Sequence, residues 1–147
     1  MIYTQLSELT SRFGDAFYTL ESGQFRRNYH ELKAAFTGIY PSFNIAYSYK
    51  TNYIPKLCRI VNELGGLAEV VSDMEMEIAL QIGVEPKNII WNGPVKNAEK
   101  AEQLLLMGGT VNIDSAHEIE FIRKMLSSHP ERVLNLGIRC NFDIGDG

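Results

Sequence analysis

Apolar positions along the chain follow two alternating patterns. Short runs rich in β-branched and aromatic residues predict strands, and after each of the first four come apolar residues at the spacing of one helix face. The unit repeats about every twenty residues, which is typical of βα units that build a parallel sheet. The predicted strands cover residues 43–49, 67–71, 88–91, 110–113 and 133–140.

The predicted helices are defined by their apolar stripes and by the residues that end them. An opening helix begins at a Ser22 cap and carries Phe25, Tyr29, Leu32 and Phe36. Glycines at 65–66, 83 and 108–109 close the helices that follow the first three strands. The stripes of the four later helices are Ile54, Leu57, Cys58, Val61 and Leu64; Met74, Ile78, Ala79 and Ile82; Ala98, Ala101 and Leu105; and Ile119, Ile122 and Leu126.

Alternation within the strands favours a barrel over an open sheet. In the first strand Phe43, Ile45, Tyr47 and Tyr49 share an apolar face, and the opposite face is small or polar. Strands of a doubly wound sheet are apolar on both faces, whereas barrel strands can present a polar interior at the level of an active site. No Gly-x-Gly-x-x-Gly motif follows the first strand. We therefore predict an α/β fold, a (β/α)₈ barrel of which this chain supplies roughly the first five strands.

Composition sets the broad class. The chain has 147 residues, 45% of them hydrophobic and 22% charged, and a net charge of −4, which predicts one globular domain without a nucleic-acid surface. No apolar run approaches the roughly 20 residues of a membrane span, so no membrane partner is expected. Two cysteines are too few for a disulfide framework and predict a reducing, cytoplasmic location. No metal site is predicted.

Polar residues follow the strands, where a barrel of this kind carries its chemistry. Lys50 ends the first strand, and Arg139 lies near the end of the fifth. A desolvated lysine close to other cations can form an imine with a carbonyl compound. Position alone equally allows Lys50 to cap a strand and point to water.

Five segments together carry a family resemblance. Residues 45–52 (IAYSYKTN) resemble the strand and lysine of the fold-type III, alanine-racemase-like pyridoxal-phosphate decarboxylases, the diaminopimelate and ornithine decarboxylase family. The resemblance continues in order through residues 68–75, 89–96, 112–119 and 136–141. It implies that residues 1–147 are the N-terminal part of the pyridoxal-phosphate-binding barrel domain, with the rest of the barrel and a C-terminal β domain absent from this chain.

The resemblance also implies roles for single residues. Lys50 is expected to bind pyridoxal 5′-phosphate covalently and to be the catalytic lysine, and Arg139 to lie beside the cofactor's phenolic oxygen. Further residues predicted to contact the cofactor are Glu69, Ser72, Glu75, Asn92 and Asp114. Glu69 could instead be a solvated charge and Glu75 a helix cap. Many relatives have histidine at the position of Asn92.

The activity implied is decarboxylation of an amino acid in the full-length protein, with meso-diaminopimelate as the first expectation and lysine as product. Ornithine, arginine and carboxynorspermidine decarboxylases and other biosynthetic relatives are alternatives, as is a non-catalytic regulatory homologue. The expected partners are a small amino-acid substrate and a second copy of the protein in a homodimer. The fragment alone is expected to be inactive.

Overall fold

Five parallel strands and the helices between them form the main body of the chain. The computed structural model describes residues 3–140 and 145. The strands are β1 (Ala46–Ser48), β2 (Leu67–Val70), β3 (Ile89–Trp91), β4 (Thr110–Ile113) and β5 (Asn135–Ile138), and they lie in the sheet in chain order. All four pairings are parallel, which confirms the predicted βα alternation.

Helices connect successive strands of the sheet. They are α3 (Pro55–Glu63), α4 (Asp73–Gln81), α5 (Ala98–Leu106) and α6 (Ala116–Ser128), with a short 3₁₀ helix η1 (Pro86–Asn88) before β3. The predicted glycine stops at the ends of α3, α4 and α5 are confirmed, because Gly65, Gly83 and Gly108 all have positive φ. No helix among the described residues is long and apolar enough to cross a membrane.

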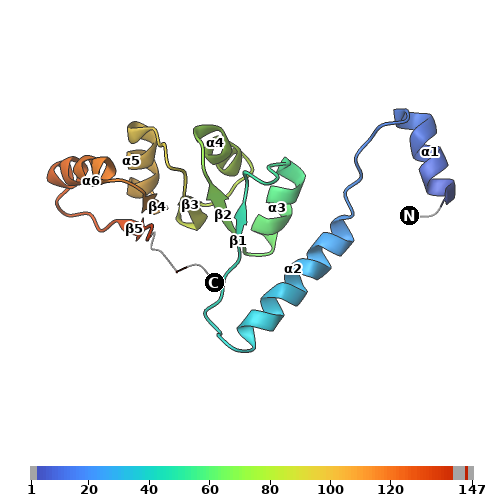
Figure 1. Cartoon of the computed structure of the whole chain (residues 1–147), viewed down its shortest axis with the longest axis horizontal. Helices are drawn as coiled ribbons and strands as arrows, with labels where there is room; N and C mark the ends of the chain where they lie inside the picture. Colours follow the sequence, from blue (N-terminus) through green and yellow to red (C-terminus); the bar gives the residue numbers. More distant parts are fainter. Residues whose placement is uncertain (1–2, 141–144, 146–147) are drawn as a thin grey trace.

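Two further helices precede the sheet. In Figure 1, α1 (Tyr3–Phe13) lies far from the sheet and α2 (Ser22–Thr37) runs towards it. The sequence did not predict α1. Ser22 was predicted as the cap of α2, but it is the first helical residue; Glu21 occupies the cap position and makes no capping side-chain bond.

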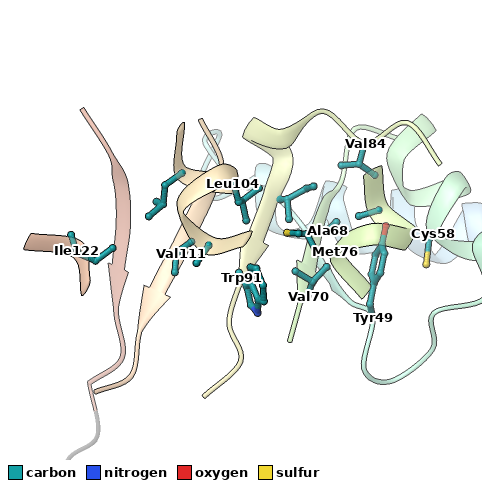
Figure 2. Packing of buried hydrophobic residues seen from close by; sticks show 14 of the residues in the cluster. Tyr49, Cys58, Ala68, Val70, Met76, Val84, Trp91, Leu104, Val111 and Ile122 are labelled. Atoms are coloured by element: carbon teal, nitrogen blue, oxygen red, sulfur yellow. The ribbon is translucent and has the colours of Figure 1, made fainter. Parts of the chain in front are cut away.

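The core lies between the sheet and helices α3 to α6. Alternate strand residues such as Val70, Ile89, Trp91 and Val111 are buried on this side, and they meet Leu104 and Met76 from the helices (Figure 2). β2, β3 and β4 each bury one apolar face under helices, which fits the predicted barrel. Burying these side chains contributes roughly 1.5–3 kcal/mol each to folding.

Three details of the predicted packing are wrong. On α4, Met74 is exposed and Met76 is buried, because the helix is turned so that Glu75 and Met76 face inward. Ile119 on α6 is half exposed. In the predicted fifth strand, alternation places Leu134, Leu136, Ile138 and Cys140 on the apolar face that helices should cover, but Ile138 is 76% exposed because β5 is the edge strand and no described helix follows it.

The two outer strands are shorter than predicted. Residues 43–45 and 49 lie outside β1, and 133–134 and 139–140 lie outside β5. Both strands have a neighbour on one side only, so fewer ladder hydrogen bonds hold their ends. The order and direction of the strands fit the predicted first five strands of a barrel.

Candidate active site at the carboxyl ends of the strands

The inner face of the sheet carries rows of side chains set by strand register. Ser48 is the register partner of Glu69, Glu69 of Ile90, Ile90 of Thr110, and Thr110 of Asn135. Partners in a parallel ladder point to the same face, so these five residues form one row across the sheet. The functional candidates lie in this row or beyond it, towards the carboxyl ends of the strands.

Lys50 lies immediately beyond β1. The strand ends at Ser48, one residue earlier than predicted, and Lys50 lies in the turn that follows. Tyr49 is buried in the core, whereas Lys50 is exposed. Its amine makes no hydrogen bond or ion pair with any described residue. An amine in this state is available to a bound molecule.

Arg139 lies just after β5 and is held by two neighbouring strand ends. Its backbone N–H donates to the Ile113 carbonyl, which places it beside the end of β4. The side-chain Nε lies 3.0 Å from Asp114 Oδ1, and Nη2 donates to Asn92 Oδ1 at 3.4 Å. The structure therefore brings three predicted residues, Asn92, Asp114 and Arg139, into one group.

Asn112 extends this group, and the sequence did not single it out. Its amide nitrogen donates to Asn92 Oδ1 at 2.9 Å, so one oxygen accepts from both Asn112 and Arg139. Gly137, its register partner on β5, makes room for it: a Cβ at Gly137 would lie 2.0 Å from Asn112 Oδ1. Residue 112 alternates with the buried Val111 along β4. This alternation was the sequence signal that could have placed Asn112 on the inner face.

Lys96 and Glu118 were also missed as members of the site. Lys96 Nζ lies 2.7 Å from Glu118 Oε1 and 3.3 Å from Asp114 Oδ2, and its side chain is 4% exposed. Lys96 lies in resembling segment 89–96 and Glu118 in segment 112–119. What the sequence could not show is that the loop after β3 passes close to the start of α6.

Glu69 and Ser48 present oxygens that the described chain does not satisfy. Glu69 Oε1 and Ser48 Oγ are buried, and neither has a hydrogen-bond partner. Buried polar atoms without partners are uncommon and are costly to maintain. Glu69 is therefore not the fully solvated strand charge that was its alternative reading.

Ser72 and Glu75 have structural contacts at the start of α4. Ser72 Oγ accepts from the Glu75 N–H, and Glu75 Oε2 accepts from the Val71 N–H at 2.8 Å. Glu75 is buried by this arrangement. Helix capping thus accounts for both residues, and their contact with a cofactor stays a prediction. Ser115 and Glu118 form a capping box at the start of α6 in the same way.

The remaining candidates add little to the site. Cys140 is exposed and Cys58 is buried, and both are free thiols. Asn141, the last residue of the fifth resembling segment, lies outside the described residues.

The arrangement is a lysine without a described partner, an arginine held by two side chains, and a set of partly buried carboxylate and amide groups at one rim of a parallel sheet. The family described as pyridoxal-dependent decarboxylase, pyridoxal binding domain, matches residues 22–147. The chain belongs to this family. The match confirms the predicted family and the predicted pyridoxal cofactor.

Individual relatives agree with this assignment. The chain is 29% identical to the diaminopimelate decarboxylase of Methanothermobacter thermautotrophicus over 95% of its length, and 32% identical to that of Methanocaldococcus jannaschii over 93%. It covers 32% of each of these proteins, so it spans about a third of the curated relatives it matches.

Solved structures share the fold. The diaminopimelate decarboxylase of Helicobacter pylori complexed with L-lysine has a TM-score of 0.81 and 26% identity, with 92% of this chain and 34% of that chain covered. The M. jannaschii enzyme has a TM-score of 0.79 and 29% identity, with 91% and 32% covered. The fold is thus the beginning of the alanine-racemase-like barrel, as predicted.

Proposed function

We propose that this chain supplies the lysine-bearing part of the active site of a pyridoxal-phosphate-dependent decarboxylase that converts meso-diaminopimelate to lysine. One observation carries the proposal: the similarity to diaminopimelate decarboxylases runs over 93–95% of the chain, and it includes the segment with the unpaired Lys50. The H. pylori and M. jannaschii relatives have both been solved with L-lysine, which is the product in this proposal.

The residues present fit a pyridoxal cofactor. An exposed amine without a partner suits an aldehyde, and a half-exposed guanidinium suits an anionic oxygen. The unsatisfied oxygens of Ser48 and Glu69 can pair with donors of a bound molecule. When bound, the cofactor supplies an aldehyde for amines and a conjugated ring that accepts the electron pair left by departing carbon dioxide.

The chain's own residues would bind, orient and move protons around that ring. Lys50 Nζ is the group that attaches and, once free, is a base able to carry a proton. Arg139 places a positive charge at the rim. Asp114 and Asn92 hold that charge in place, and Glu69 offers an acceptor deeper in the barrel.

Asn92 would contact the substrate or the cofactor ring. Its Oδ1 already accepts from Asn112 and Arg139, which leaves its amide nitrogen as the group to face a ligand. An amide in this position can donate a hydrogen bond, but unlike a histidine it does not titrate near neutral pH.

A homodimer and a cytoplasmic location are further parts of the proposal. Both cysteines are free, which supports a reducing compartment. The dimer is supported by the family resemblance, and light scattering of the full-length protein tests it: a mass of one chain would contradict it.

The substrate is tested with purified full-length protein and added pyridoxal phosphate. Carbon dioxide release is measured for meso-diaminopimelate, L-ornithine, L-arginine and carboxynorspermidine, with Lys50→Ala as the inactive control. We expect kcat/KM to be highest for meso-diaminopimelate. A higher value for another amine would move the assignment to that substrate, and no release from any of them by a protein that binds the cofactor stoichiometrically would favour the regulatory homologue.

A further inference from the structure

Lys96 is the most buried cation of the described chain that forms an ion pair. It follows β3 in the loop that leads to α5, and its ammonium lies between two carboxylates, those of Asp114 and Glu118. The side chains of Asp114 and Glu118 are 8% and 17% exposed. Lysine is almost never buried to this degree unless it is paired, so the charge is part of a built arrangement.

Asp114 connects this buried cation to the active-site rim. Its Oδ2 faces Lys96 at 3.3 Å, and its Oδ1 faces Arg139 Nε at 3.0 Å. Arg139 is half exposed and lies on the rim, whereas the Lys96 side chain is 4% exposed. The Asp114 carboxylate therefore joins a half-exposed cation on the rim to a buried cation behind it.

Glu118 fixes the other side of Lys96. Its Oε2 accepts from the backbone N–H groups of Asp114, at 2.7 Å, and Ser115, at 3.2 Å. Its second oxygen accepts from Lys96. The start of α6 thus holds Glu118 in one place, and Glu118 holds the ammonium against Asp114.

The charges in this cluster balance. Lys96 and Arg139 are positive, and Asp114 and Glu118 are negative. Without Lys96, two buried carboxylates would share Arg139 as their nearest cation. The guanidinium would be drawn towards them and away from the barrel interior, because uncompensated buried charge is far more costly than a shifted surface side chain.

We propose that Lys96 is a positioning residue for the cofactor: acting through Asp114, it determines where Arg139 holds its guanidinium. This inference rests on the proposed role of Arg139, and it does not depend on which amino acid is the substrate.

A double-mutant cycle on cofactor binding tests the inference. The dissociation constant of pyridoxal phosphate and the visible circular dichroism of the bound cofactor are measured without substrate for the full-length protein, Lys96→Met, Arg139→Ala and the double variant. We expect each single change to weaken binding about tenfold, and the double variant to bind like Arg139→Ala. The dichroic band should weaken equally in all three variants.

Lys100→Met is the matched control. Lys100 also pairs with two carboxylates, Asp73 and Glu77, but its side chain is 30% exposed and no described ion pair joins either carboxylate to Arg139. Its loss should leave cofactor affinity unchanged. Asp114→Asn keeps the shape of the connecting group without its charge, and it should weaken binding as Lys96→Met does; it replaces that variant if Lys96→Met does not fold.

The measured affinities distinguish positioning of Arg139 by Lys96 from a purely structural role of Lys96. Effects of Lys96→Met and Arg139→Ala that multiply would overturn the inference, because a merely structural lysine acts independently of Arg139. So would unchanged affinity in a folded Lys96→Met protein. Unchanged affinity in Arg139→Ala would overturn both this inference and the proposed role of Arg139, whereas a different preferred substrate in the decarboxylation assay would leave the inference intact.

Discussion

Ser48 and Glu69 are register partners on β1 and β2, and each keeps a buried oxygen that no described residue satisfies. They lie in the same row of the inner face, and Ser48 precedes Lys50 by two residues. A pair of unsatisfied oxygens there costs stability in the empty protein, and it suits a ligand that brings hydrogen-bond donors.

Replacing Glu69 should therefore have opposite effects on folding stability and on cofactor binding. We expect Glu69→Met to raise the unfolding free energy of the cofactor-free protein by about 1 kcal/mol, because a buried acceptor without a partner is removed. The same change should weaken binding of pyridoxal phosphate. Urea denaturation and cofactor titration measure the two effects, with the exposed Glu99→Met on α5 as control. Lower stability together with unchanged binding would show that Glu69 is satisfied by groups outside the described chain.

The attachment site can be mapped directly. Borohydride reduction of the full-length protein with its cofactor should leave a pyridoxyl group on Lys50, because its amine is exposed and has no described partner. Peptide mass mapping identifies the modified residue. Lys56, exposed on α3 a few residues later, is the matched control, and Lys56→Ala should leave the labelling unchanged. A pyridoxyl group on Lys56 or Lys96 would contradict the assignment.

Gly137 should be needed for space at the site. A Cβ at this position would lie 2.0 Å from Asn112 Oδ1, so Gly137→Ala must displace the amide that bonds to Asn92. We expect a loss of about 1–3 kcal/mol of unfolding free energy, as for other overpacked sites, together with weaker cofactor binding. Gly23→Ala on α2 is the control: its Cβ would meet only Arg27, at 3.6 Å, and alanine is the better helix former. Equal effects of the two changes would show that Asn112 moves without cost.

Ser72 can be assigned by comparison with Ser115. Both cap a helix through a bond from the N–H three residues later, so alanine at either should cost about 1 kcal/mol of stability. If Ser72 also contacts the cofactor, as the family resemblance implies, Ser72→Ala should in addition weaken cofactor binding and Ser115→Ala should not. Denaturation and cofactor titration of both variants decide this. Equal cofactor affinity in the two would leave Ser72 as a helix cap alone.

The sequence was most informative where local pattern determines structure. Short apolar runs predicted β2, β3 and β4, and each of these strands has neighbours on both sides and a helix behind it. It was less informative at β1 and β5, where a missing neighbour shortens the strand. The helix α1 was missed because it contributes nothing to the sheet's core.

The residues of the site likewise divide into those that the sequence could predict and those that it could not. Asn92, Asp114 and Arg139 follow strands, so their shared rim was predictable from topology. Lys96 and Glu118 lie in a loop and a helix start, and only the three-dimensional path of the chain brings them together. Asn112 was hidden for a different reason: its place beside Asn92 depends on the empty volume at Gly137, a relationship between residues on different strands.

Stability should fall at alkaline pH because of two buried groups next to β1. Burial raises the pKa of the Cys58 thiol and of the Tyr49 phenol above their ordinary values. Both groups are neutral when protonated, so the folded state keeps these protons at pH values where the unfolded chain releases them. The native state then binds more protons than the unfolded state, and the unfolding free energy decreases as pH rises.

The decline should begin near the unfolded pKa of cysteine, about 8.5, and steepen near that of tyrosine, about 10. Urea denaturation at a series of pH values from 7 to 10 measures it. Cys58→Ala should flatten the first part of the decline, although it lowers stability at every pH by emptying a buried site. Cys140→Ala removes an exposed thiol and should leave the slope as it is. If the Cys58→Ala protein loses stability between pH 8 and 9.5 as steeply as the unaltered one, the buried thiol is not the group responsible.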